Sequence, residues 1–200
     1  MAKVIIDMSM SLDGFIAGMN DSQENPLGDG GGILHDWLFN GENDSNYNAF
    51  FKLSQESKFV FDESFDATGA IVTGRRTFDI VGGWGGNHPI NVPVIVITHS
   101  IPKVIPKGST SFTFMTNGIK QAVQQAKKAA GNKNVGISGA SVAQQCMREK
   151  LVDEIHIHLV PVLLGDGVRL FEPSSKVTNM EKYKVINAPG VTHFKFQVKK

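Results

Sequence analysis

Two stretches of the chain constrain its fold more than any other part of the sequence. Residues 135–141 read VGISGAS, an apolar strand pattern that ends at a glycine and opens a helix. Residues 151–171, LVDEIHIHLVPVLLGDGVRLF, contain a helix end, a turn and a buried strand that runs to a Gly-Asp-Gly corner. A strand that enters a helix through small residues leaves free backbone N–H groups at one point, which suits an anion. The two stretches therefore indicate an enzyme that binds a phosphate-bearing cofactor.

Apolar runs alternate with helical patterns along the first three-quarters of the chain. We expect strands at 4–10, 70–73, 93–98, 135–138 and 154–164, and helices at 44–57, 75–81, 119–130 and 141–151. Residues 183–186 and 193–198 alternate like antiparallel strands, and the glycine-rich segments 20–32 and 82–89 predict loops, the second of them flexible. This order predicts an α/β protein with a mixed, mostly parallel sheet and an antiparallel C-terminal edge.

Composition narrows the class of protein further. The chain has 200 residues and a formal net charge of +1, so we expect one domain over 1–200 and no nucleic-acid partner, which would need a basic face. Its one cysteine allows neither an intrachain disulfide nor a cysteine-based metal cage. No apolar run reaches the roughly 18 residues that a membrane span needs, and the first residues do not resemble a signal peptide. We expect a cytoplasmic protein.

The familiar nucleotide and hydrolase signatures are absent from the sequence. No glycine-rich run fits G-x-G-x-x-G, and no Gly-Lys pair exists for a P-loop. The zinc pattern H-E-x-x-H, the deaminase pattern H-x-E with P-C-x-x-C, and the hydrolase elbow G-x-S-x-G are missing as well. Any ligand site must therefore be assembled from residues scattered along the chain.

Small and polar residues follow four of the predicted strands. They are Asp13 in 11–17, the run 73–77 (TGRRT), Thr98 in 98–100, and the run 138–141 (SGAS). Each run also fits an ordinary turn or a solvated helix end. Four of them at successive strand ends, where α/β sheets bind ligands, favour a common site.

The chemistry of these runs suits phosphate. Gly74 allows close backbone approach, Thr77 offers a hydroxyl, and Arg75 can fork onto phosphate oxygens. A side chain at Gly139 would block a pyrophosphate lying on the following helix, and Ser141 could cap that helix or contact phosphate.

Other candidate residues favour structural roles. His156 and His158 share one face of a strand, but no third ligand lies nearby in the sequence, so we expect no metal site. Cys146 lies on the apolar stripe of its helix, as expected for a core thiol rather than a nucleophile. Trp84 fits either a lid over a cofactor or an anchor for its loop.

The ordered set of motifs resembles a known family. MSLDGFIA at 10–17, TGRRTF at 73–78, PVIVIT at 93–98, ISGAS at 137–141 and the stretch 151–171 are similar to the reductase domain of the riboflavin-biosynthesis deaminase-reductase. That domain belongs to the dihydrofolate-reductase-like superfamily. The resemblance covers nearly the whole chain apart from 18–58. It implies a mixed sheet with helices on both faces, a homodimer, and NADPH as hydride donor.

The resemblance also implies roles for particular residues. Cofactor-binding positions would be Ala17, Gly74, Arg75, Thr77, Thr98, Gly139, Ala140 and Ser141. Asp13 would be catalytic and face the substrate, and Leu164 and Gly165 would border the substrate pocket.

Three departures from the family's pattern bear on the substrate. The sequence contains no match to the deaminase domain, so we expect a stand-alone reductase at most. Phe15 stands where the riboflavin enzymes tend to carry lysine after Asp-Gly, which weakens the case for a phosphorylated ribosyl substrate. The acid of dihydrofolate reductase itself has no clear equivalent, although Asp36 is one candidate.

The motifs favour an NADPH-dependent reductase that transfers hydride to a small polar heterocycle, similar to 5-amino-6-(5-phosphoribosylamino)uracil reductase. Asp13 would position the substrate or pass a proton. A dihydrofolate or pterin reductase, a non-catalytic nucleotide-binding protein and a dimeric scaffold with no ligand are the alternatives.

Overall fold

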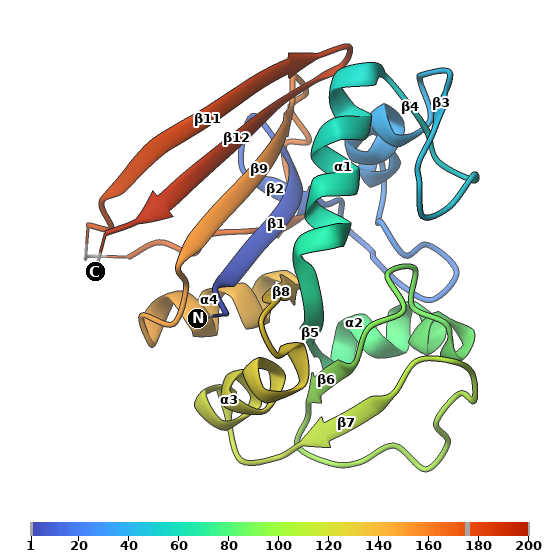
Figure 1. Cartoon of the computed structure of the whole chain (residues 1–200), viewed down its shortest axis with the longest axis vertical. Coiled ribbons are helices and arrows are strands. Elements are labelled where there is room, and N and C mark those ends of the chain that lie inside the picture. The colour runs from blue at the N-terminus through green and yellow to red at the C-terminus, as the bar shows by residue number, and fades with distance from the viewer. Residues whose placement is uncertain (1, 175–176, 200) are drawn as a thin grey trace.

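The computed structural model describes residues 2–174 and 177–199 and is built on one eight-stranded sheet (Figure 1). The strand order is β11-β12-β9-β1-β8-β5-β6-β7. The six strands from β9 to β7 run parallel to their neighbours, whereas β12 is antiparallel to β9, and β11 is antiparallel to β12. This is the expected mixed sheet, mostly parallel, with an antiparallel C-terminal edge.

The elements of the sheet and its helices have the following bounds. The strands of the large sheet are β1 (Val4–Ser11), β5 (Thr68–Gly74), β6 (Val94–Ile97), β7 (Phe112–Met115), β8 (Asn134–Ser138), β9 (Glu154–Val160), β11 (Met180–Ala188) and β12 (Val191–Val198). The α-helices are α1 (Gln55–Ala67), α2 (Arg75–Ile80), α3 (Ile119–Ala130) and α4 (Ala140–Arg148), and the 3-10 segments are η1 (Gly31–Leu38) and η2 (Gly82–Gly86). Two small pairs, β2 (Phe15–Ala17) with β10 (Val168–Arg169) and β3 (Asn43–Asp44) with β4 (Lys52–Leu53), lie in the connections.

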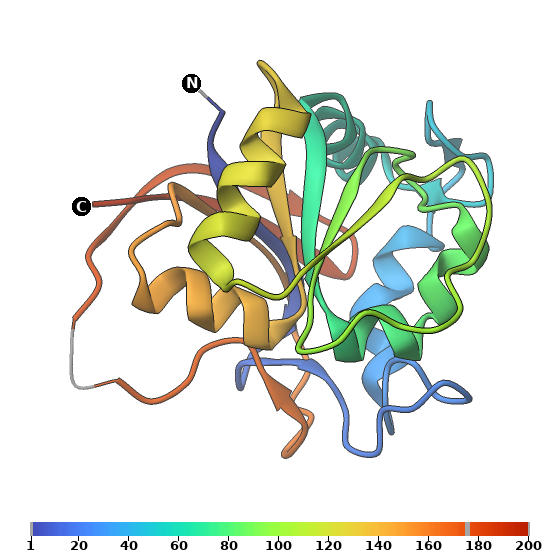
Figure 2. The same cartoon turned by 90° about the horizontal axis from the view of Figure 1, so that it is seen from below.

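The main core lies between the sheet and helices α3 and α4, which share one face (Figure 2). Ile6 of β1 and Val72 of β5 point into it and are fully buried. Cys146 of α4 belongs to the same core and is completely enclosed, as expected for a core thiol. Burial raises the pKa of this thiol to about 12, so it stays protonated and inert.

The opposite face of the sheet carries α1, α2 and η1, and it is far more polar. Side chains alternate along a strand, so the neighbour of Ile6, Asp7, points to this second face, where Ser64 of α1 donates to its carboxylate at 2.6 Å. Trp37 of η1 is 4% exposed and donates to the hydroxyl of Ser9 at 2.9 Å. The expectation of helices on both faces is therefore confirmed.

Two expected elements differ from the structure. Residues 44–57 do not form a helix: β3, a turn and β4 occupy most of them, and α1 begins only after Ser54. Residues 82–89 are not a free flexible loop, because η2 is held by backbone bonds from Trp84 to Val81 and from Thr110 to Gly86. The Trp84 ring packs on His88 with centroids 4.5 Å apart, which makes it a loop anchor.

Within the described residues, no helix is long and apolar enough to cross a membrane.

Candidate active site

The predicted site residues follow five strands that are neighbours in the sheet. β9, β1, β8, β5 and β6 lie side by side and parallel, so their carboxyl ends share one edge. In that order they lead to Leu164 and Gly165, Asp13, Gly139, Gly74 and Thr98. Motifs that are far apart in the sequence thus meet along one edge, where α/β sheets bind ligands.

The centre of this edge consists of two adjacent strand-to-helix turns. Thr73 of β5 pairs with Ser138 of β8, so the turns that follow them lie next to each other. Gly74 is the N-cap residue of α2 and Gly139 is that of α4, and neither makes a side-chain cap hydrogen bond. The amides of the first turn of α4 therefore remain open to an anion.

The contact between these turns requires glycine at position 139. Gly139 has a φ of +91°, and a Cβ built on it would lie 2.6 Å from the Thr77 hydroxyl of α2. Side chains rarely adopt this φ, and that distance is a clash. Gly139, with Ala140 and Ser141 after it, thus forms one surface with Thr77, which a side chain at position 139 would displace.

Arg75 joins this surface to the end of β6. Its guanidinium pairs with Asp79 one turn along α2 at 2.8 Å and donates to the backbone oxygen of Ser100 at 2.8 Å. The hydroxyl of Thr98 donates to the same oxygen at 2.7 Å. The structure therefore brings Arg75 and Thr98 together, with the guanidinium side chain still one-third exposed.

Asp13 organises the other end of the edge. Its carboxylate accepts from the Ser11 hydroxyl at 2.5 Å and from the amides of Gly165 and Leu164 at 2.7 and 3.2 Å. The Ser11 hydrogen bond, helped by the two amides, lowers the pKa of Asp13, so the group is a carboxylate at neutral pH. Asp13 thereby fixes the corner where Leu164 and Gly165 lie.

Two further predicted residues occupy the flap beside that corner. Ala17 of β2 pairs with Val168 of β10, and its backbone oxygen lies so close to Gly167 that a Cβ there would approach to 2.2 Å. Phe15 points into the protein and is 2% exposed. Asp36, in η1, is exposed to solvent.

Sequence reasoning missed Arg169 at this flap. Its guanidinium carbon lies 4.3 Å from the centroid of the Phe15 ring, and it donates to the backbone oxygen of Asp13 at 3.0 Å. The side chain is exposed at the same corner as Gly165. The pairing of β10 with β2 brings this cation to the site, and no sequence pattern predicts that pairing.

A buried chain of polar side chains was also missed. His158 of β9 donates from Nε2 to Asp7 at 2.7 Å, and its Nδ1 atom lies 2.8 Å from Nδ1 of His193 in β12. His193 in turn lies 3.1 Å from the Ser57 hydroxyl. Among the described residues no group of three or more His, Cys, Asp or Glu side chains could hold a metal ion. Polar residues at every second position, 7, 9 and 11, could have indicated this polar face of β1 from the sequence.

The sheet order and the open turns along its carboxyl edge define a dihydrofolate-reductase-like α/β protein. Among solved structures, the chain is similar to a putative riboflavin biosynthesis protein from Shewanella sp. PV-4, with a TM-score of 0.69 and 24% identity over the whole of both chains. It is also similar in fold to dihydrofolate reductase from Enterococcus faecalis complexed with NADP(H), with a TM-score of 0.59 and 13% identity, over 99% of this chain and 97% of the other.

The chain belongs to the RibD C-terminal domain family, whose model matches residues 2–194. Among individual proteins it is 25% identical over 185 residues to the uncharacterized protein YwjB of Bacillus subtilis (strain 168), covering 89% of this chain and 87% of YwjB. The predicted family resemblance is thus confirmed. Family membership supports a reductase-type role.

Proposed function

We propose that this protein is an NADPH-dependent reductase. The observation that carries the proposal is the pair of adjacent, uncapped turns at Gly74 and Gly139, which places open backbone amides of α4 beside the Thr77 hydroxyl. Such a surface suits the pyrophosphate of a dinucleotide. Membership of the RibD C-terminal domain family supports hydride transfer as its use.

The cofactor would lie along the edge from β8 to β6. Gly139, Ala140 and Ser141 would hold the pyrophosphate, and Gly74 and Thr77 would complete that cradle. Arg75 and Thr98 would lie on the adenosine side, where a guanidinium suits an additional phosphate. Ala17 would contact the cofactor from the flap. When bound, NADPH supplies the hydride, and the protein's part is to align donor and acceptor and exclude water.

The substrate would bind at the corner that Asp13 organises. Because Asp13 is a hydrogen-bonded carboxylate, we expect it to position the corner and the substrate rather than donate a proton. Arg169, stacked on Phe15, would pair with an anionic substituent, a role that Phe15 cannot fill. This favours a small polar heterocycle that carries a negative group, similar to the substrate of 5-amino-6-(5-phosphoribosylamino)uracil reductase.

A thermal-shift titration with NADPH and NADH tests the cofactor. Ligand at about 100 times its dissociation constant adds roughly 2.7 kcal/mol to the free energy of unfolding, which is a shift of several degrees. We expect a clear shift with NADPH, and we expect Arg75→Ala to weaken NADPH binding more than NADH binding. Equal losses would exclude a contact of Arg75 with the 2′-phosphate, and no shift with either nucleotide would contradict the proposal.

Turnover distinguishes a reductase from a non-catalytic nucleotide binder. With pyrimidine, pterin and flavin acceptors, we expect oxidation of NADPH, and we expect Asp13→Asn to lower kcat with little change in NADPH affinity. Tight NADPH binding without oxidation by any acceptor would favour the binder. We also propose a homodimer on the strength of the family resemblance, to be checked by light scattering on the purified chain.

A further inference from the structure

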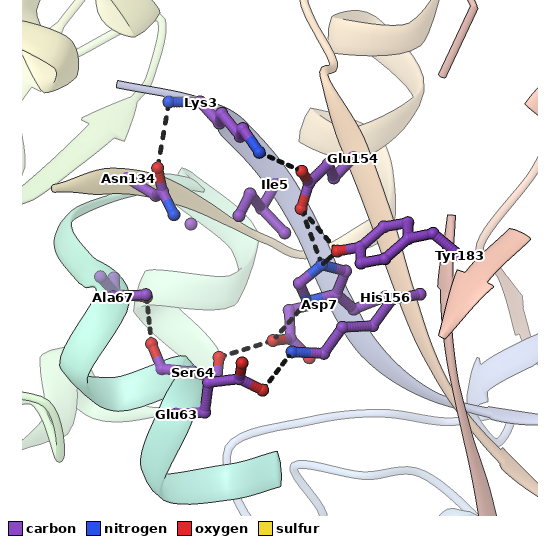
Figure 3. A pocket seen from close by; sticks show the side chains of 13 residues that line it. Lys3, Ile5, Asp7, Glu63, Ser64, Ala67, Asn134, Glu154, His156 and Tyr183 are labelled. Carbon is purple, nitrogen blue, oxygen red and sulfur yellow. Dashed lines mark hydrogen bonds and ion pairs between the residues drawn. The ribbon is translucent and has the colours of Figure 1, made fainter. Parts of the chain in front are cut away.

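Arg169 differs from the other arginines of the chain in having no acidic partner. The other three are each paired with a carboxylate: Arg75 with Asp79, Arg76 with Asp21, and Arg148 with Glu172. The charged cavity between α1 and the starts of β1 and β9 is paired in the same way, Lys3 with Glu154 and Lys195 with Glu63 (Figure 3). Among the described residues, no carboxylate lies within ion-pair distance of Arg169. Its positive charge is therefore available to a ligand.

The guanidinium of Arg169 is held in place and stays accessible. Its carbon lies 4.3 Å from the centroid of the Phe15 ring, which is 2% exposed and forms a fixed floor beneath it. One N–H of Nη1 donates to the backbone oxygen of Asp13 at 3.0 Å. The remaining N–H donors have no protein partner among the described residues, and the residue is exposed to solvent. A positioned cation with open donors suits an anionic group of the ligand.

The glycine amides around Arg169 are not available to that anion. We call residues 11–17 and 162–170 the Arg169 corner. Each glycine amide of this corner already donates to a protein oxygen: Gly14 to Ser11 at 3.0 Å, Gly165 to Asp13 at 2.7 Å, and Gly167 to Asp166 at 2.7 Å. Phosphate sites typically draw on several open backbone amides, as the start of α4 provides. At the Arg169 corner, the guanidinium is the group that an anion can use.

The charge of the Arg169 corner disfavours an anion with two negative charges. Its two segments contain two acids, Asp13 and Asp166, and one base, Arg169, so their formal net charge is −1. A phosphate monoester would add about −1.5 to −2 at neutral pH, whereas a carboxylate adds about −1. The second charge of a phosphate would find no further cation in these segments, and it would be repelled by the two carboxylates.

A carboxylate also matches the shape of the group that binds it. Its two coplanar oxygens accept parallel hydrogen bonds from one planar guanidinium. Two apolar side chains lie at the same corner: Leu12 is 63% exposed and Leu163 is 69% exposed, and the Leu12 amide donates to the backbone oxygen of Val162 at 2.9 Å. Exposed apolar surface beside the cation suits the apolar or aromatic stem that carries a carboxylate.

We propose that the negative group of the substrate is a carboxylate bound by Arg169, and not a phosphate monoester. The inference rests on the proposed function for calling this ligand a substrate, whereas the choice between the two anions rests on the Arg169 corner alone. The substrate class is then a heterocycle with a carboxylate in place of a ribosyl phosphate. The buried ring of Phe15, which supports Arg169 and cannot pair with phosphate, agrees with this class.

Amide NMR of the full-length protein tests the proposal with three phenyl probes. Benzoate carries the carboxylate, benzamide has the same shape without charge, and phenyl phosphate is a dianion at about pH 8. We expect benzoate to shift the signals of Gly14, Gly165 and Gly167 saturably, and the other two probes to leave them unchanged at the same concentration. Phenyl phosphate should instead shift the signals of 139–141, and its failure to do so would count against the proposed cofactor edge.

Three variants separate the charge of Arg169 from its structural contacts. Arg169→Gln should weaken benzoate binding at least about tenfold, because it removes a charged hydrogen-bond donor. Arg148→Gln removes the same charge from a surface pair with Glu172 and should bind benzoate like the parent protein. Asp166→Asn keeps an oxygen for the Gly167 amide and removes one negative charge, so phenyl phosphate should gain more affinity for the corner than benzoate does. This last variant tests the proposal even if Arg169→Gln fails to fold.

Three results would overturn the proposal. The first is an equal response, or no response, of the corner glycines to benzoate and benzamide. The second is unchanged benzoate binding in Arg169→Gln. The third is phenyl phosphate binding at the corner of the parent protein as tightly as benzoate. A thermal shift with NADPH but no benzoate response would overturn the carboxylate and leave the reductase standing, whereas benzoate binding that depends on Arg169 without any NADPH shift would do the reverse.

Discussion

At the scale of single residues, Gly139 occupies a position that favours glycine for two reasons. Its φ of +91° and the nearby Thr77 hydroxyl each disfavour a side chain. We expect Gly139→Ala to lower the free energy of unfolding by about 1–2 kcal/mol through backbone strain alone. The added methyl group also pushes Thr77 away, so NADPH affinity should fall at least about tenfold, as measured by calorimetric titration.

Gly131 offers a matched control for that substitution. It also has a left-handed backbone, with a φ of +62°, but a Cβ built on it meets nothing within 4 Å. Gly131→Ala should therefore cost similar stability and leave NADPH affinity unchanged. Equal losses of affinity in the two variants would show that backbone strain, and not the contact with Thr77, limits binding.

Two buried histidines make stability depend on pH. Burial lowers the pKa of His193 to about 3 and that of His88 to about 4. Both pKa values lie below the unfolded value of about 6.5, so below that pH the unfolded chain binds protons that the folded chain does not. The contribution of these neutral rings to the free energy of unfolding is therefore fully present above about pH 7. It falls as the pH drops toward 4, by up to about 1.4 kcal/mol per pH unit for each ring.

Urea unfolding at about pH 5 and about pH 7.5 measures this loss. His88→Gln should give a shallower dependence, since one of the two rings no longer takes up a proton on unfolding. Stability that stays constant between those two pH values would contradict the neutral, buried state of these rings.

Some residues of the candidate site could be predicted from the sequence immediately around them, and others could not. Gly74, Thr77 and Gly139 were predictable because a strand, a small residue and a helix follow one another in the sequence. Arg169 and Asp7 were not, because their roles depend on the pairing of β10 with β2 and on α1 lying over β1. Side chains that act through contacts between distant segments leave little trace in a single sequence.

At the scale of elements, α1 shows how aromatic spacing can mislead. Tyr47, Phe50 and Phe51 recur at helical intervals, yet they precede the helix. Phe50 packs on Phe39 and Phe51 on Phe61, with ring centroids 5.3 and 4.9 Å apart, so tertiary contacts explain their spacing. The real start of the helix is marked by Ser54.

Ser54 is the N-cap of α1, and its hydroxyl accepts from the amide of Ser57 at 3.1 Å. We expect Ser54→Ala to lower the free energy of unfolding by about 1 kcal/mol, and Ser54→Thr to retain most of that stability because it keeps the hydroxyl. The urea midpoint, at an unchanged denaturant slope, checks this. Equal losses in both variants would assign the effect to packing.

At the scale of the whole molecule, the sheet presents different chemistry at its two ends. The carboxyl ends of β5 and β8 carry open amides for an anion, and the amino ends of β1 and β9 carry carboxylates. The mostly parallel sheet that creates this separation was predicted from alternating strands and helices in the sequence, although the strand order was not. The acidic end did not, because β1 and β9 become neighbours only through the parallel pairing of Asp7 with His156.

Hydrogen exchange in the presence of NADPH should slow at one end of the sheet and not at the other. We expect slower exchange of the amides at 74–78 and 139–143, which would contact the cofactor, and unchanged exchange at 5–7 and 154–158. Mass spectrometry of peptides from the two ends measures both effects in one experiment. Protection confined to the amino ends of the strands would contradict binding of the nucleotide at the carboxyl ends.

The enclosed thiol of Cys146 has a practical consequence for all of these measurements. It is the chain's one cysteine, and it lies fully inside the main core, with its pKa raised to about 12 by burial. A cysteine introduced at any exposed position is therefore the only thiol that a maleimide dye reaches in the folded protein. The parent sequence needs no cysteine removal before fluorescent labelling, and slow modification of Cys146 itself reports how often the core opens.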